Sequence, residues 1–165
     1  MVWAGRYRGP GARSRHSIAA RKLTLLHCPG EEVKLTSRSE YALLALIYLA
    51  RNQSREYIPV QTIASVQQIP PRFLEQILLT LRRANYVHST RGKGGGFLLS
   101  KSPDEISLAE IIRLFDGALA PTESVSKYFY GATPIEKEGR LLGIFQELRD
   151  YIAEKMEKTH LADVI

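Results

Sequence analysis

The sequence predicts a mainly α-helical protein with a small β-wing, namely a winged helix-turn-helix domain followed by a long C-terminal helix. Three observations predict this fold. Two short helical segments flank a proline-containing turn at residues 67–71, a glycine-rich basic stretch follows at residues 91–96, and a long amphipathic pattern covers residues 135–158. A helix-turn-helix that is followed by a basic hairpin has the element order of a winged helix.

The first predicted helix covers Tyr41–Ala50 and precedes the helix-turn-helix. We expect this helix to be buried, because it is apolar nearly all round. The residues before it predict a capping box, in which Ser37 accepts a hydrogen bond from the backbone and Glu40 reaches back to Ser37.

Two helices are predicted at Gln61–Val66 and Arg72–Asn85, and Pro71 suits the first turn of the second one. Strands are predicted at Tyr86–Thr90 and Phe97–Ser100. Between the strands, the four glycines within residues 91–96 give the hairpin tip unusual backbone freedom. This tip is not a nucleotide-binding loop, because it joins strand to strand and lacks the closing Lys-Ser/Thr of a P-loop.

The C-terminal third begins with a helix that runs from a capping box at Ser107 to Asp116, where Gly117 suits the helix end. Residues 118–134 are loop-like, and a long helix is predicted over residues 135–158. Apolar residues line one stripe of this helix: Leu141, Phe145, Leu148, Ile152 and Met156. We expect the stripe to pair with a second copy of the chain, because the winged domain has its own core. Packing of the stripe on its own domain is the alternative.

Positive charge is concentrated in the middle of the chain. Residues 34–99 hold nine Arg or Lys against three Glu, whereas residues 100–165 hold eight Arg or Lys against twelve Asp or Glu. A polyanion such as double-stranded DNA would therefore be held by the middle third of the chain. A solvated basic face is the plainer interpretation of the same charges.

Cysteine and histidine usage limits the chemistry of the chain. Cys28 is the single cysteine, so one chain can form no disulfide and no zinc or iron–sulfur site built from several thiolates. The four histidines are scattered, and no metal-ligand spacing, catalytic triad or paired-carboxylate arrangement occurs. We therefore predict no metal or cofactor, no enzymatic activity, and a cytoplasmic location.

A membrane-spanning helix is also not expected. The longest apolar run has ten residues, Tyr41–Ala50, which is about half of the roughly 20 that a membrane-spanning helix needs. We interpret this run as a buried helix of the folded domain.

The helix at 72–85 and the hairpin tip supply the residues that could read DNA. Side chains in the first turns of such a helix reach base edges, and Arg, Gln and Glu can read guanine, adenine and cytosine respectively. Glycine lets the wing backbone approach phosphate, and an arginine is attracted to a narrow minor groove. The predicted DNA-binding residues are Arg72, Glu75, Gln76, Arg91, Lys93, Gly94 and Gly95.

Four segments are predicted along the chain. Residues 1–32 are rich in Gly, Pro and Arg without a hydrophobic period, so we expect a disordered or non-native extension, with Val33 as the true start. A basic segment that tracks phosphates and an organellar transit peptide are the alternatives. Residues 33–101 form the winged helix-turn-helix domain, residues 102–134 a linking helix and loop, and residues 135–165 the dimerisation helix and C-terminal cap.

These residues resemble the IscR/CymR/NsrR-type family of bacterial winged helix-turn-helix regulators. The resemblance covers residues 33–165 and rests on the segments at 34–43, 73–78, 81–84, 91–97, 106–117 and 159–164. The combination of Leu74-Glu75-Gln76 with Gly94-Gly95-Gly96 is specific to this pattern. The resemblance implies a homodimer whose long helices cross at the two-fold axis, a palindrome-like operator, and DNA contacts from Glu75, Gln76 and Arg91.

The chain departs from this family at one place. Many members hold an iron–sulfur cluster on three cysteines between the Asp-Gly helix end and the dimerisation helix, but Gly117–Pro134 contains none here. The chain therefore resembles a cluster-free branch. Tyr128, Phe129 and Tyr130 occupy this interval and form a possible effector loop for a small molecule or a protein.

The sequence thus predicts a dimeric DNA-binding transcriptional regulator, which we expect to act as a repressor. A winged-helix module that binds another protein and does not bind DNA is the alternative. Binding to genomic fragments over a series of salt concentrations distinguishes these two functions, because binding to DNA releases counterions.

Overall fold

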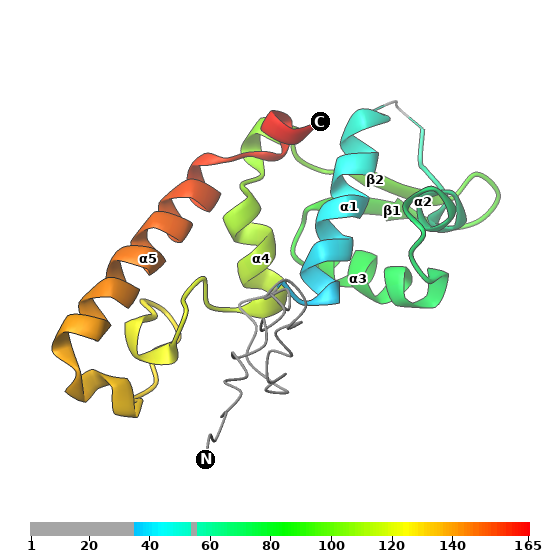
Figure 1. Ribbon diagram of the computed structural model, residues 1–165. Helices are drawn as coiled ribbons and strands as arrows, with labels where there is room; N and C mark the ends of the chain where they lie inside the picture. The colour runs from blue at the N-terminus through cyan, green and yellow to red at the C-terminus, as the bar shows by residue number, and fades with distance from the viewer. Residues whose placement is uncertain (1–34, 54–55) are drawn as a thin grey trace, which may run out of the picture. The chain divides into compact units, whose positions relative to one another are not determined.

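Apolar residues on the first three helices build the core of the protein. The computed structural model describes residues 35–53 and 56–165, and the expectation for residues 1–32 lies outside these ranges. The helices are α1 (Ser37–Arg51), α2 (Val60–Gln67), α3 (Pro71–Arg83), α4 (Leu108–Asp116) and α5 (Gly139–Lys158), and the strands are β1 (Val87–Thr90) and β2 (Gly96–Leu99). This arrangement confirms the predicted fold class, a mostly helical protein with a two-stranded wing (Figure 1).

Helix α1 lies at the centre of the core. Its residues Ala42, Ala45 and Leu46 are fully buried, as expected from a helix that is apolar nearly all round. It packs against α2, α3, α4, β2 and the C-terminal 3-10 turn at Leu161–Val164. Leu74, Ile77, Leu78 and Leu81 of α3 fill the same core.

The wing is an antiparallel pair in which Val87 lies opposite Leu99 and Thr90 lies opposite Gly96. A third backbone segment joins it, because Ile58 and Phe97 form an isolated bridge. The Ile58 amide donates to the Phe97 carbonyl at 2.9 Å, and the Phe97 amide donates to the Ile58 carbonyl at 2.8 Å. The loop before α2 is thereby attached to the wing.

The predicted capping box at the start of α1 is wrong. Thr36, not Ser37, occupies the N-cap position, and no side chain of α1 caps the helix. The carboxylate of Asp116 from the end of α4 fills this place, since it accepts from the Thr36 amide at 3.1 Å and from the Thr36 hydroxyl at 2.5 Å. It also accepts from the buried Ser39 hydroxyl at 2.5 Å. An acid 80 residues away in sequence was beyond the reach of a local capping pattern.

The predicted capping box of α4 is present. The Glu110 amide donates to the Ser107 hydroxyl, and the Ser107 amide donates to the Glu110 carboxylate, each at 3.3 Å. Gly117 ends the helix with φ of 81°, a conformation that favours glycine. The chain returns to the same place at its C-terminus, where the Leu161 amide donates to the Ile106 carbonyl at 2.8 Å and the Leu161 side chain is fully buried.

The long C-terminal helix is shorter than the predicted 135–158. A separate 3-10 turn covers Pro134–Lys137, and Glu138 leaves helical geometry with φ of −105° and ψ of 75° before α5 begins at Gly139. Residues 35–53 and 56–165 belong to one compact unit, and the predicted division after residues 101 and 134 stays a prediction. Within the described ranges, every helix is too short or too polar to cross a membrane.

Replacing Asp116 by Ala should lower the free energy of unfolding by about 1–3 kcal/mol. The Thr36 amide and hydroxyl lose their acceptor, and the buried Ser39 hydroxyl keeps only the Thr36 carbonyl. Urea unfolding followed by circular dichroism measures this loss. Glu147→Ala, which removes an exposed carboxylate of α5, is the control and should change stability by less than about 0.5 kcal/mol. Equal stability of the two variants would contradict the capping role of Asp116.

Candidate nucleic-acid interface

Helix α3 divides into a buried face and an exposed polar face. Its apolar residues at helical spacing are buried, whereas Arg72, Glu75 and Gln76 in the first two turns are exposed. These three are the residues for which base contacts were predicted. The three side chains are therefore accessible near the N-terminal end of α3, while the apolar face of the same helix is buried in the core.

The turn between α2 and α3 is held by backbone geometry. Gln68 ends α2 in the left-handed region with φ of 55°, and the Ile69 amide donates to the Ala64 carbonyl at 2.9 Å. Ile69 is buried, and Pro71 occupies the first turn of α3. The left-handed residue was not predicted, because a glutamine gives no sequence signal for that conformation.

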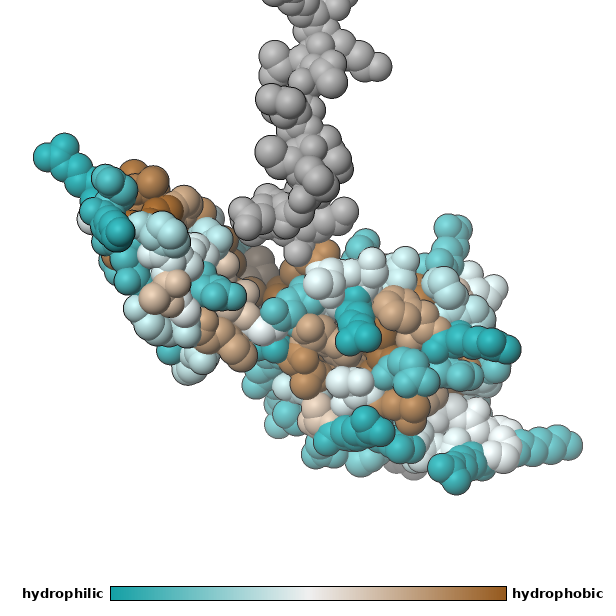
Figure 2. All heavy atoms as spheres, turned by 90° about the horizontal axis from the view of Figure 1, so that it is seen from below, coloured by the Kyte–Doolittle hydropathy of each residue, from teal (hydrophilic) through white to brown (hydrophobic). Residues whose placement is uncertain are grey.

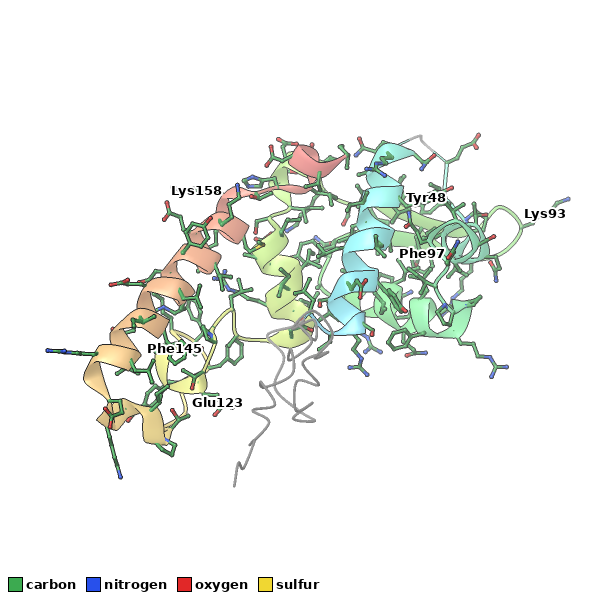
Figure 3. All side chains as sticks on the ribbon, viewed as in Figure 1. Tyr48, Lys93, Phe97, Glu123, Phe145 and Lys158 are labelled. Atoms are coloured by element: carbon green, nitrogen blue, oxygen red, sulfur yellow. The ribbon has the colours of Figure 1, made fainter. Side chains whose placement is uncertain are left out.

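The tip of the wing is exposed and depends on glycine at two positions. Gly92 has φ of 94° and Gly94 has φ of 81°, which only glycine adopts without strain. The Gly95 amide donates to the Gly92 carbonyl at 2.9 Å and closes the turn. Arg91 and Lys93 are exposed beside these glycines, and Lys93 extends from the tip away from the domain (Figure 3).

At Gly95 and Gly96, carbonyl groups of other residues lie so close that no side chain would fit. A Cβ on Gly95 would lie 2.6 Å from the Thr90 carbonyl oxygen, and a Cβ on Gly96 would lie 2.3 Å from the Ile58 carbonyl oxygen. Gly95 was predicted as a DNA-binding residue, and its place in the turn gives it a structural reason to be glycine. The structural need for glycine at position 96 was not predicted, because its neighbour Ile58 is distant in sequence.

A side-chain hydrogen bond links the wing to the C-terminal part of α3. The Arg82 guanidinium of α3 donates to the Ser89 hydroxyl of β1 at 3.1 Å. Arg82 therefore connects the two elements that carry the predicted DNA-binding residues. The neighbouring Arg83 is exposed at the end of the helix.

The predicted dimerisation stripe on α5 is half-buried at some positions and exposed at others. Phe145, Ile152 and Met156 are half-buried, and the last two line an apolar cavity of about 230 Å³ together with Leu35 and Ile112. Figure 3 shows Phe145 on the side of α5 that faces the loop. Leu141 and Leu148 are exposed, and beside them lie two further exposed apolar residues that the stripe omitted, Ile144 and Tyr151.

The predicted effector loop exposes its three aromatic side chains. Tyr128, Phe129 and Tyr130 have exposed fractions of 73%, 51% and 65%. Tyr128 lies against Arg113 of α4, with 5.5 Å between the guanidinium carbon and the ring centre. The Tyr130 hydroxyl donates to the Glu136 carboxylate at 2.8 Å, and this acceptor raises the pKa of Tyr130.

The residues of the loop do not fit an iron–sulfur cluster. Such clusters are held mainly by cysteine thiolates. The interval Gly117–Pro134 has no cysteine, and Cys28 lies outside the described residues. In residues 35–53 and 56–165, no three His, Cys, Asp or Glu side chains gather where they could hold a metal ion.

Comparison with known proteins gives consistent matches. Residues 35–165 match the Rrf2 family model, described as an iron-dependent transcriptional regulator. An rrf2-like HTH-type transcriptional regulator of Rhodobacter capsulatus is 41% identical over 99 residues, which cover 58% of this chain and 66% of that protein. An HTH-type transcriptional regulator of Mycobacterium tuberculosis is 34% identical over 133 residues, covering 80% of this chain and 81% of that protein.

A solved structure of a transcriptional regulator is also similar to this chain. CymR of Bacillus subtilis, described as its global cysteine regulator, superposes with a TM-score of 0.65 at 28% identity, covering 81% of this chain and 96% of that chain. These matches confirm the resemblance seen in the sequence. They are all to transcriptional regulators, in agreement with the prediction of a non-enzymatic protein.

Replacing Gly96 by Ala should destabilise the protein by about 1–3 kcal/mol, because the new Cβ would overlap the Ile58 carbonyl and disturb both hydrogen bonds between Ile58 and Phe97. Urea unfolding measures the change. Gly139→Ala is the matched control, since nothing lies within 4 Å of its Cβ, and it should leave stability unchanged or raise it by up to about 1 kcal/mol. A Gly96→Ala protein as stable as the unmodified one would refute the close approach.

Proposed function

This chain belongs to the Rrf2 family of helix-turn-helix transcriptional regulators, and we propose that it is a homodimeric repressor that reads a palindrome-like operator with α3 and the wing. The observation that carries this proposal is the hydrogen bond from Arg82 to Ser89, which joins the helix with the exposed polar face, α3, to the exposed basic hairpin. A regulator of this kind would work in the cytoplasm of a bacterium, where its operator lies.

The proposed contacts divide into two classes. Arg72, Glu75 and Gln76 of α3 would contact base edges in the major groove, where each base pair presents a distinct pattern of donors and acceptors. Arg91 and Lys93, with the glycine backbone at 94 and 95, would contact phosphate or the adjacent minor groove. The first class would set the sequence that is read, and the second would supply charge-dependent affinity.

A homodimer is supported by the exposed side of α5. Leu141, Ile144, Leu148 and Tyr151 follow one another at spacings of three, four and three, which places them along one side of the helix. Figure 2 shows uncovered apolar side chains at the end of the protein that carries α5 and its neighbouring loop. A second copy would cover them by the same contacts in both directions, and two-fold symmetry would match a palindromic operator.

Repression would follow from operator occupancy, because a bound dimer excludes other proteins from the same DNA. The loop with Tyr128, Phe129 and Tyr130 would be the place of an effector. A winged-helix module that binds another protein and no DNA is the competing function, and the DNA-binding measurement below separates the two.

Binding to genomic fragments that include the protein's own promoter should be sequence-specific and should weaken steeply with added salt. Arg91→Ala should lower the affinity about tenfold and reduce the slope of log affinity against log salt by about one, because one cation leaves the interface. Fluorescence anisotropy measures both quantities. Arg140→Ala, which removes an exposed cation of α5, is the control and should keep the affinity. Affinity indifferent to salt and to Arg91→Ala would favour the protein-binding function.

Ile144→Glu should weaken the homodimer at least tenfold, because it places a charge within the exposed apolar side of α5. Analytical ultracentrifugation over a concentration series measures the dissociation constant. Gln146→Glu adds the same charge at another exposed position of the helix and should leave the dimer intact. If Ile144→Glu has no effect whereas Phe145→Ala dissociates the dimer, the interface lies on the half-buried residues of the predicted stripe and not on the exposed ones.

A further inference from the structure

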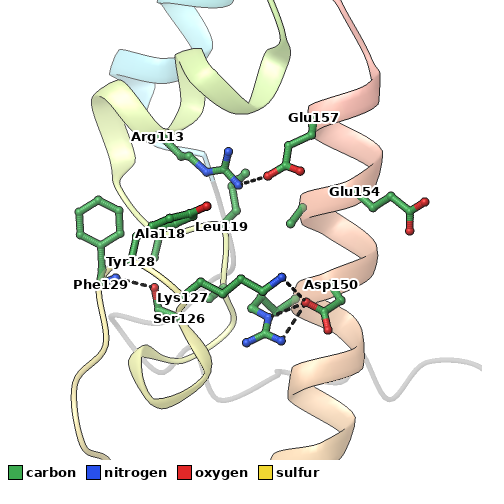
Figure 4. A pocket seen from close by; sticks show the side chains of 13 residues that line it. Arg113, Ala118, Leu119, Ser126, Lys127, Tyr128, Phe129, Asp150, Glu154 and Glu157 are labelled. Atoms are coloured by element: carbon green, nitrogen blue, oxygen red, sulfur yellow. Dashed lines mark hydrogen bonds and ion pairs between the residues drawn. The ribbon is translucent and has the colours of Figure 1, made fainter.

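Several cations in the C-terminal part of the chain have carboxylate partners, whereas Arg38 has none. The Arg113 guanidinium lies 2.5 Å from a Glu157 carboxylate oxygen, and the Lys127 ammonium lies 3.2 Å from Asp150 (Figure 4). Arg38 in the first turn of α1 is exposed and contacts no carboxylate of the residues that the structure describes. Its charge is therefore available to an anion outside the chain.

The first turn of α1 lies beside the first turn of α3. Tyr41 of α1 and Phe73 of α3 form an edge-to-face contact with 5.7 Å between their ring centres. Arg38 precedes Tyr41 by three residues, which places the two side chains only about 60° apart around the helix. Arg72, for which a base contact is proposed, directly precedes Phe73. The aromatic pair therefore brings Arg38 to the end of α3 that carries the proposed base contacts.

The acidic side chains closest to Arg38 in the structure lie on other sides of α1. Glu40 follows Arg38 by two residues and points about 160° away from it around the helix. The Asp116 carboxylate accepts hydrogen bonds from Thr36 and Ser39, where α4 meets α1. These hydrogen bonds also fix the first turn of α1, so only the side chain of Arg38 would lose freedom when it binds a partner.

The dimensions of DNA decide what a residue at this place can contact. The major groove is about 12 Å wide, and an α-helix with its side chains is about 10–12 Å across. A helix that reads bases therefore fills the groove. A residue packed beside the inserted end of that helix meets the sugar–phosphate backbone that borders the groove, and not the base edges.

We propose that Arg38 binds a backbone phosphate next to the base pairs that α3 reads, so that the first turn of α1 is a third DNA-contacting element besides α3 and the wing. An arginine suits this task, because its guanidinium can donate two parallel hydrogen bonds to one phosphate. Such a contact fixes the register of the protein on the duplex and carries no sequence information. It rests on the proposed function, since it adds a contact to the same operator.

The test measures fluorescence anisotropy of the full chain with its tightest-binding genomic fragment and with a scrambled fragment of the same length. Arg38→Ala should lower the affinity for both fragments by a similar factor, about tenfold at low salt. The slope of log affinity against log salt should fall by about one for each copy of the chain that contacts the fragment. Arg38→Lys should keep the original slope, because lysine also neutralises a phosphate.

Arg51→Ala is the matched control, because it removes the same charge from the opposite end of α1, where Arg51 is also exposed. It should keep both affinities. Phosphate ethylation interference on the tightest-binding fragment then locates the contact. Ethylation of the contacted phosphate should weaken binding of the unmodified chain and of Arg51→Ala, and should make no further difference to Arg38→Ala.

The proposal is overturned if Arg38→Ala loses no more affinity than Arg51→Ala. It is also overturned if Arg38→Ala weakens binding of the genomic fragment alone, since Arg38 would then read a base. Specific binding that Arg91→Ala weakens and Arg38→Ala does not would remove this contact and leave the proposed function intact. If no genomic fragment is bound in preference to the scrambled one, the proposed function fails, and the Arg38 contact fails with it.

Discussion

The burial of α1 is the constraint on which the rest of the structure depends. Ala42, Ala45, Leu46 and Leu49 have almost no exposed surface, because other elements cover the helix on several sides. The helix-turn-helix, the wing, α4 and the C-terminal turn at Leu161–Val164 all pack on it. A protein interior is close-packed, so the elements around one buried helix hold each other in position through it.

Hydrogen bonds with residues distant in sequence also hold the two ends of α1. The amide and hydroxyl of Thr36, the residue before α1, donate to the carboxylate of Asp116 at the C-terminal end of α4. The end of α1 is held in a similar way, since the Arg51 guanidinium donates to the Val164 carbonyl at 3.3 Å. Both contacts join residues more than 75 positions apart, so the helix that carries the core also ties the C-terminal part to the winged domain.

The features that were predictable from sequence have local causes. The proline-containing turn, the glycine-rich tip and the capping box at Ser107 each follow from the preferences of neighbouring residues, and the structure contains all three. The cap of α1 and the need for glycine at position 96 come from Asp116 and Ile58, which are distant in sequence. The DNA-contacting roles of Arg72, Gln76 and Arg91 remain a prediction, and the structure adds that their side chains are accessible.

The apolar stripe on α5 shows what the periodicity of a sequence cannot predict. Spacings of three and four identify an apolar helix surface, but they do not say how many partners cover it. Within Gly139–Lys158, no residue is fully buried. Ile144 and Tyr151 are 60% and 68% exposed, whereas Phe145 and Ile152 are half-buried. Helices gain most of their stability from tertiary packing. The chain itself covers only part of the apolar surface of α5, and the proposed second copy would cover the exposed part.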